Sequence, residues 1–341
     1  MISSPLLPVS LSFLKAFIAD AWRSARGVQL PRRPLILTYF VTFRCDLKCA
    51  YCDYSTEHFS RRFPELDTIG ARDVLRICRE GNPGIAFSGG EPLVRADIAE
   101  LVHFARQLNY KPISLFTNSM QLPGKEEILD NVDYLQISLD TLDTELQDRL
   151  CGRPGTGHQI IANVQRYAAL QRQKHFRLNI NCVLCPETFG SVKDLLRFAA
   201  DTKVRFTVSP QLDEDGQPAD FFRDATMLRQ YQESIDTILS YKRLTDVVLD
   251  TVPFLQHLRE LRTGPCYPML TPRIYPDGSL RFPCSIVCRS ARSVSEVGSW
   301  EEIVNGLNSV PTECSAPCLL PCYLQTSLVT QHPLVLLQEF R

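Results

Sequence analysis

The chain has 341 residues, of which 44% are hydrophobic and 22% are charged, and this composition is typical of a globular protein rather than a disordered one. Its 37 Lys and Arg balance 38 Asp and Glu, so a broad cationic face and a nucleic-acid partner are not expected. No apolar run is long enough to cross a bilayer, and no secretion signal is recognisable. We therefore expect a cytoplasmic protein whose 13 cysteines bind metal rather than form disulfides.

Residues 1–33 form an amphipathic N-terminal extension in which apolar residues recur at helical spacing. One interpretation is a helix that caps the main domain. The other is a helix that lies on an anionic membrane surface, because Trp22, Arg23 and Arg26 flank the apolar face. The second interpretation would make the protein peripheral to the membrane.

Strand-like and helix-like segments alternate from residue 34 to residue 215. The expected strands cover residues 35–43, 84–88, 112–117, 134–139, 176–184 and 204–209. Six strand–helix units in succession predict a parallel sheet, and right-handed crossovers curl it into a partial (β/α)6 barrel, an α/β fold. Residues 216–265 are typical of a helical bridge, and residues 266–341 of a small cysteine-rich C-terminal domain.

The first cysteine motif directly follows the first expected strand. Cys45, Cys49 and Cys52 have C-x3-C-x2-C spacing. Three thiolates can hold three irons of a four-iron cluster and leave one iron open to a ligand. The carboxyl ends of barrel strands are also where working loops lie. Structural zinc, with His58 as the fourth ligand, is the alternative.

A second motif follows the second strand, where residues 88–93 read SGGEPL. Together with the cysteine triplet and Tyr51 before its last cysteine, this motif resembles the signature of the radical S-adenosylmethionine (SAM) superfamily, over about residues 34–212. The resemblance implies a [4Fe-4S] cluster on the three cysteines, bound SAM, and an electron from a flavodoxin or ferredoxin. It also implies cleavage of SAM to a 5′-deoxyadenosyl radical that abstracts hydrogen from a substrate.

Residues around the GGEP motif are the first candidates for SAM binding. Gly89 and Gly90 lack side chains where the chain must approach a ligand closely. Glu91 offers an acceptor for the SAM ammonium group. Thr117 and Asn118 end the third strand and would face the same ligand. Helix capping or turn formation alone could account for them, and equally for Ser138 and Asp140 at the end of the fourth strand.

The resemblance supplies three more candidates. Tyr51 resembles the residue that meets the adenine, and Ser138 and Asp140 match positions that bind the ribose in relatives. For the SAM carboxylate the family often has an arginine after the fourth strand. Arg149 and Arg153 are candidates, but Cys151 stands where an arginine is common. Cys182 and Cys185 at the end of the fifth strand are expected to be buried structural residues.

The C-terminal cysteines surround a predicted hairpin over residues 275–283, with a Pro-Asp-Gly turn. They resemble the SPASM and twitch extensions of radical SAM enzymes, which carry auxiliary iron–sulfur clusters. Two departures are G-x5-C spacing after Gly278 and a C-x3-C-x3-C string. We expect one auxiliary [4Fe-4S] cluster, with Cys288 as a spare and zinc as the alternative metal. Its expected ligands are Cys266, Cys284 and two of Cys314, Cys318 and Cys322.

The predicted function is radical chemistry on a peptide or protein substrate, which the SPASM-like region favours. Oxidation or rearrangement of a small molecule by the same chemistry is the enzymatic alternative. A metal-stabilised binding protein without catalysis is the alternative of another class. The intact cysteine triplet and Glu91 argue against that last alternative.

Overall fold

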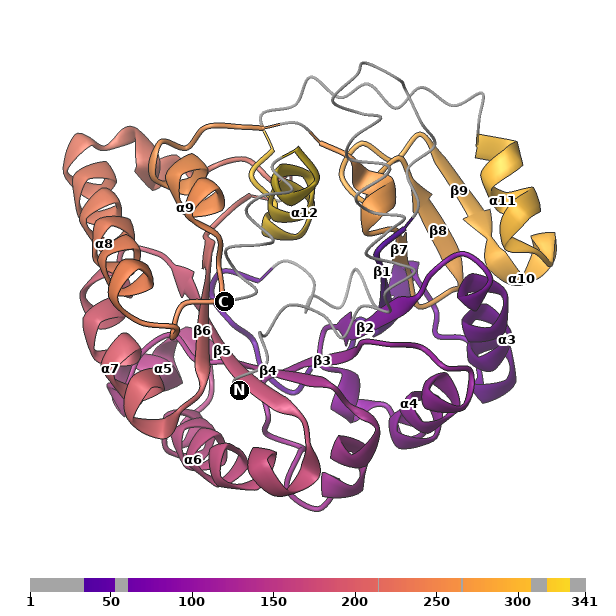
Figure 1. The fold of residues 1–341 in the computed structure, drawn as a ribbon, viewed down its shortest axis with the longest axis horizontal. Helices are drawn as coiled ribbons and strands as arrows, with labels where there is room; N and C mark the ends of the chain where they lie inside the picture. Colours follow the sequence, from indigo (N-terminus) through magenta and orange to yellow (C-terminus); the bar gives the residue numbers. More distant parts are fainter. Residues whose placement is uncertain (1–33, 53–60, 214, 265, 308–317, 332–341) are drawn as a thin grey trace.

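The computed structural model describes residues 34–52, 61–213, 215–264, 266–307 and 318–331 (Figure 1). The amphipathic extension over residues 1–33, His58 and Cys314 lie outside the described residues. Within the described ranges, no helix is both long and apolar enough to cross a membrane.

A parallel sheet of six strands forms the centre of the molecule, as the sequence predicted. These strands are β1 (Ile36–Thr42), β2 (Gly84–Gly89), β3 (Ile113–Thr117), β4 (Tyr134–Ser138), β5 (Arg177–Leu184) and β6 (Arg205–Pro210). They lie side by side in chain order, each paired in parallel with the next. Strand β6 ends the strand order, where Phe206 forms a parallel bridge with Val248, and it does not pair with β1. The barrel is therefore partial and not closed by hydrogen bonds.

Helices cover the outer face of this curved sheet (Figure 1). They are α3 (Thr68–Arg79), α4 (Ile98–Gln107), α5 (Thr144–Cys151), α6 (Thr156–Lys174), α7 (Val192–Thr202) and α8 (Ala225–Leu244). Helix α9 (Val252–Arg259) packs against α8. Side chains alternate between the two faces of each strand. On β4, Leu135 and Ile137 are buried, whereas Gln136 and Ser138 on the opposite face remain partly exposed. The apolar face joins the main hydrophobic core.

The C-terminal segment continues the same sheet. Its strands are β7 (Arg273–Ile274), β8 (Ser279–Phe282) and β9 (Ser290–Ser293). The predicted hairpin is confirmed, since β7 and β8 are antiparallel and Gly278 takes a positive φ of 77° in the turn. Strand β7 also pairs in parallel with β1, with Thr38 opposite Arg273. The division of the chain into four domains remains a prediction.

Three helices complete the described fold: α10 (Val294–Val297), α11 (Trp300–Leu307) and α12 (Pro321–Gln331). Helix α12 packs against α9, so the last described segment returns to the barrel (Figure 1). This return brings the cysteines of α12 and of the segment before it towards the exit of β6.

Candidate active site

The loop that carries the first three cysteines is fixed by backbone hydrogen bonds to the end of α5. The Lys48 N–H donates to the Cys151 carbonyl at 3.1 Å, and the Ala50 N–H donates to the Leu150 carbonyl at 2.9 Å. Helix α5 ends at Gly152 in a left-handed conformation, where a Cβ would lie 2.8 Å from the Lys48 carbonyl oxygen. The loop and the helix end are therefore built to fit one another.

The three thiols are half-buried at the carboxyl end of β1. Burial raises the pKa of the Cys45 thiol, whose sulfur accepts the Leu47 N–H at 3.4 Å. Among the described residues, no three Cys, His, Asp or Glu side chains lie close enough together to hold a single metal ion. In a four-iron cluster, by contrast, each thiolate binds a different iron. A loop of three half-buried thiols, in which the Cys45 sulfur accepts a backbone N–H, fits that group.

The sequence did not reveal a fourth thiol at this loop. Cys151 is buried in the last turn of α5, and its side chain is hydrogen-bonded with that of Cys49. The Gln147 side-chain amide also donates to the Cys151 sulfur, at 3.2 Å. The two arginine candidates for the SAM carboxylate, Arg149 and Arg153, are exposed beside it.

The two glycines of the GGEP motif pack directly on the chain that leads into the cysteine loop. A Cβ on Gly89 would lie 2.0 Å from the Thr42 carbonyl oxygen, and one on Gly90 would lie 2.4 Å from the Arg44 carbonyl oxygen. The Gly90 and Glu91 N–H groups donate to the same two carbonyls, at 2.8 and 2.9 Å. The structure thus explains the two glycines by the close contact between the chain at the end of β2 and the chain at the end of β1, where a side chain would not fit.

Glu91 brings together three of the predicted site residues. Its carboxylate accepts the Thr117 hydroxyl at 2.8 Å, the Asn118 N–H at 2.7 Å and the Leu93 N–H at 2.9 Å. The side chain is buried, and burial raises its pKa to about 7 although these hydrogen bonds act in the opposite direction. A carboxylate has about four lone-pair sites, so it retains capacity for a further donor. An incoming ammonium group would favour its ionised form.

Tyr51 and Asp140 form the second contact between predicted site residues. The Tyr51 hydroxyl donates to the Asp140 carboxylate, whose other oxygen accepts the Val183 N–H at 2.8 Å. Burial raises the pKa of the Tyr51 phenol, which therefore stays protonated as a donor. The Gln147 side-chain oxygen accepts the Asp140 N–H at 3.0 Å and holds this turn in place. Ser138 lies two residues before Asp140, at the end of β4 and opposite Asn181 of β5.

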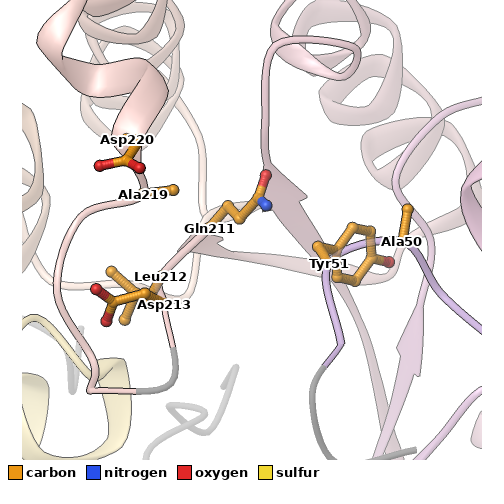
Figure 2. Close-up of a pocket in the computed structure, with 7 residues that line it drawn as sticks. All are labelled: Ala50, Tyr51, Gln211, Leu212, Asp213, Ala219 and Asp220. Carbon is orange, nitrogen blue, oxygen red and sulfur yellow. The ribbon is translucent and has the colours of Figure 1, made fainter. Parts of the chain in front are cut away.

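A cavity of about 350 Å³ opens beside Tyr51 (Figure 2). Ala50 and Tyr51 form one side, and the segment after β6 forms the other with Gln211, Leu212, Asp213, Ala219 and Asp220. Cavities of a few hundred Å³ are the usual size for small-molecule sites. The cysteine loop and the segment after β6 thus flank a space beside Tyr51 that could hold a ligand.

The structure brings together three of the predicted C-terminal ligands. The Cys318 thiol interacts electrostatically with Cys322 and Cys284, and burial raises its pKa to about 11. Backbone N–H groups donate to the sulfurs of Cys284 and Cys318, both at 3.4 Å, from Val287 and Leu320 respectively. Thiols grouped with amide donors fit an iron–sulfur centre.

Two further C-terminal cysteines are among the described residues. Cys266 is exposed, and the Cys288 thiol donates to the Ser290 carbonyl at 3.2 Å. Cys182 and Cys185 at the end of β5 are buried free thiols.

An open parallel barrel with a three-cysteine loop after its first strand agrees with the resemblance to the radical SAM superfamily that the sequence motifs carry. Residues 39–199 match the Radical SAM superfamily, so the chain contains a radical SAM domain.

Known proteins resemble both the sequence and the fold. The chain is 32% identical over 176 residues to PqqA peptide cyclase from Gluconobacter oxydans (strain 621H), which covers 50% of this chain and 48% of that protein. It therefore matches about half the length of this relative. Streptococcus suis SuiB has the same fold with a TM-score of 0.63 and 17% identity, over 87% of this chain and 70% of SuiB. anSMEcpe with bound AdoMet and Cp18Cys peptide has a TM-score of 0.60 and 20% identity, over 81% of each chain.

Proposed function

We propose that this chain is a radical SAM enzyme in which Cys45, Cys49 and Cys52 hold a [4Fe-4S] cluster that binds SAM. When bound, the cluster and SAM supply reductive cleavage to methionine and a 5′-deoxyadenosyl radical, which takes a hydrogen atom from the substrate. The observation that carries the proposal is the three-thiol loop at the carboxyl end of β1, fixed to α5 and placed beside a cavity within a radical SAM domain.

The chain's own residues would bind and orient SAM. Glu91 would receive the ammonium group with the lone-pair capacity that Thr117 and Asn118 leave unused. Tyr51 would contact the adenine, since it forms a wall of the cavity. Ser138 and Asp140 would bind the ribose, and the Tyr51–Asp140 hydrogen bond would set the position of both side chains. Gly89 and Gly90 would let this ligand approach the backbone.

The second part of the proposal concerns the C-terminal cysteines. Cys266, Cys284 and two of Cys314, Cys318 and Cys322 would hold an auxiliary [4Fe-4S] cluster, with zinc as the alternative metal. The turn after β6 supports an exchange of electrons with the substrate. A Cβ on Gly216 would lie 3.0 Å from the Cys318 sulfur, and the Gly216 carbonyl accepts the Leu319 N–H at 2.9 Å. The same turn continues from the cavity wall formed by Leu212 and Asp213, so it connects this wall to Cys318.

A peptide or protein is the proposed substrate. The named activity of PqqA peptide cyclase supports it. The fold is also shared with SuiB bound to the precursor peptide SuiA, at a TM-score of 0.60 and 19% identity over 92% of this chain and 76% of SuiB. Oxidation of a small molecule is the second candidate, because the cavity has the size of a small-molecule site. A flavodoxin or ferredoxin in the cytoplasm is the proposed electron donor. The extension over residues 1–33 would provide any peripheral membrane contact.

The substrate class can be tested with short peptides encoded beside the gene. The reconstituted protein is incubated anaerobically with SAM, a reductant and each peptide, and the peptide mass is followed. We expect a loss of hydrogen mass that depends on SAM. Peptides that remain unchanged while a small alcohol or cofactor precursor is oxidised would favour the second candidate. A chain that binds metal but leaves SAM intact would support the binding protein without catalysis.

A further inference from the structure

A buried arginine stands at the junction of the barrel and the C-terminal cysteines. Arg273 opens β7, opposite Thr38 of β1, and its side chain is 6% exposed. Its guanidinium lies 4.7 Å from the Tyr323 ring centroid and 5.6 Å from that of Phe40. Burying a charged group is costly unless partners compensate it. The fold therefore holds a cation at this point between two aromatic rings.

The partners of this cation include the proposed metal ligands. One Arg273 nitrogen, Nη2, donates to the Cys322 sulfur at 2.6 Å, and Nη1 donates to the Ser285 hydroxyl at 2.7 Å. The Cys318 thiol also interacts electrostatically with Arg273. The guanidinium thus contacts one sulfur directly and acts on a second one through its charge.

We propose that Arg273 is a positioning residue that raises the reduction potential of an auxiliary [4Fe-4S] cluster by donating a charge-assisted hydrogen bond to the Cys322 sulfur. The inference rests on the proposed function, which supplies the cluster. Reduction adds one electron and moves no atoms, so a fixed positive charge beside a ligand sulfur stabilises the reduced form more than the oxidised form. Hydrogen bonds to the sulfurs and burial are general determinants of cluster potential.

The chain offers a matched control for this arginine. Arg281 faces Arg273 across the β7–β8 pair. Its guanidinium lies 5.1 Å from the Tyr275 ring centroid and 5.5 Å from that of Phe63. Both arginines therefore lie in the same hairpin with the guanidinium near two aromatic rings. Among the described contacts, the hydrogen bond to a cysteine sulfur is made by Arg273.

The test uses the full chain in a background where Cys45, Cys49 and Cys52 are replaced by Ala, so that the auxiliary centre alone is observed. Iron content is measured after anaerobic reconstitution, and the midpoint potential is measured by a redox titration followed by electron paramagnetic resonance. In Arg273→Met we expect the ratio of reduced to oxidised cluster at the parent midpoint to fall about tenfold, a shift of about 59 mV to more negative potential for a one-electron couple. Arg273→Lys keeps the charge but loses the planar fork, so its shift should be smaller. Arg281→Met should leave the midpoint unchanged.

The possible failures can be told apart. A parent that holds zinc, or no second iron centre, would contradict the auxiliary cluster of the proposed function and this inference with it. A parent with the cluster whose midpoint is unchanged in Arg273→Met would overturn the inference alone. An equal shift in Arg281→Met would also overturn it, because any positive charge in the hairpin would then suffice. If both Arg273 variants lose their iron, the residue serves assembly rather than potential, and the inference is wrong.

Discussion

The two groups of cysteines differ in what holds them in place. The loop with Cys45, Cys49 and Cys52 is fixed by backbone hydrogen bonds to α5, and the loop carrying Gly90 packs on the chain that leads into it. In the C-terminal group, backbone N–H groups donate to the sulfurs of Cys284 and Cys318, and the guanidinium of Arg273 contacts Cys322. The backbone contacts of the first loop exist without a metal, whereas a small loop-rich unit draws much of its folding energy from the metal it binds. The first site should therefore be preformed, and the second should depend on its metal for order.

The largest effect should follow from removing the first group of thiols. With Cys45, Cys49 and Cys52 all replaced by Ala, we expect complete loss of SAM cleavage and of the iron bound at this site, because no ligands remain. The barrel should stay folded, because backbone hydrogen bonds between its strands do not depend on these thiols. Iron analysis, 5′-deoxyadenosine formation and circular dichroism check this. Cys185→Ala, at the end of β5, is the control that should retain cleavage; cleavage that persists in the triple variant would refute the assignment.

Removing two of the proposed auxiliary ligands should have a narrower effect. Cys266 and Cys284 replaced by Ala should leave about half of the parent's iron, because one of two clusters is lost. Cleavage of SAM should remain, whereas turnover of the true substrate should fall much further. Hydrogen exchange should speed up in β7–β9 and α12, while β1 and the first cysteine loop stay protected.

Cys288→Ala serves as the control for that double variant, because its thiol contacts the Ser290 carbonyl in the structure. Iron content that is the same in the parent and in the double variant would reject the auxiliary site. Loss of protection throughout β1–β6 would instead contradict the contrast between a preformed site and a metal-dependent one.

A smaller effect is expected at the carboxylate of the GGEP motif. Glu91→Gln should weaken SAM binding by about 1–3 kcal/mol, which is roughly 5-fold to 150-fold, and leave the cluster assembled. Because burial raises the Glu91 pKa to about 7, the carboxyl group ionises as pH rises through neutrality. The parent's affinity for SAM should therefore increase from about pH 6 to about pH 7.5, where an α-ammonium group still carries its proton.

Calorimetric titration of SAM at several pH values measures this dependence. The Gln variant should show a flat profile over the same range, and Glu100→Gln on the exposed surface of α4 should behave like the parent. A parent affinity that falls as pH rises through neutrality would show that Glu91 does not receive the ammonium group.

The smallest effect tests how much the contact with the end of α5 stabilises the first cysteine loop. Gly152→Ala puts a Cβ 2.8 Å from the Lys48 carbonyl oxygen at a positive φ, whereas Gly155→Ala shares the positive φ and meets nothing within 4 Å. A left-handed Ala costs about 1–2 kcal/mol. Urea denaturation should show that Gly155→Ala lowers the free energy of unfolding by about this amount and that Gly152→Ala lowers it further. Gly152→Ala should also incorporate iron more slowly. Equal losses in the two variants would mean that the contact between α5 and the loop contributes little.

Local patterns in the sequence were sufficient for the barrel and for much of the site. The six strands were predicted because each is a short apolar or alternating run between helical segments, and the structure confirms their parallel order. The cysteine loop and the GGEP motif follow strands directly, so their meeting at one edge of the sheet could be expected. The structure adds the contacts of Glu91 with Thr117 and Asn118.

Contacts between distant residues could not be read from local patterns. The pairing of β7 with β1, the approach of Cys151 to Cys49 and the hydrogen bond from Arg273 to Cys322 each join segments separated by many residues. Gly152 directly after a helical segment was a recognisable helix-end pattern, and it could have located the close contact of α5 with the loop. An arginine within a two-residue strand carries no comparable pattern.

The central claim, that the first cysteine group is a site for radical SAM chemistry, is tested most directly by analysing the metal and the products of the anaerobically purified and reconstituted chain. We predict iron and sulfide in the proportions of four-iron clusters, and formation of 5′-deoxyadenosine and methionine from SAM after reduction. Zinc without iron, together with intact SAM, would contradict the account.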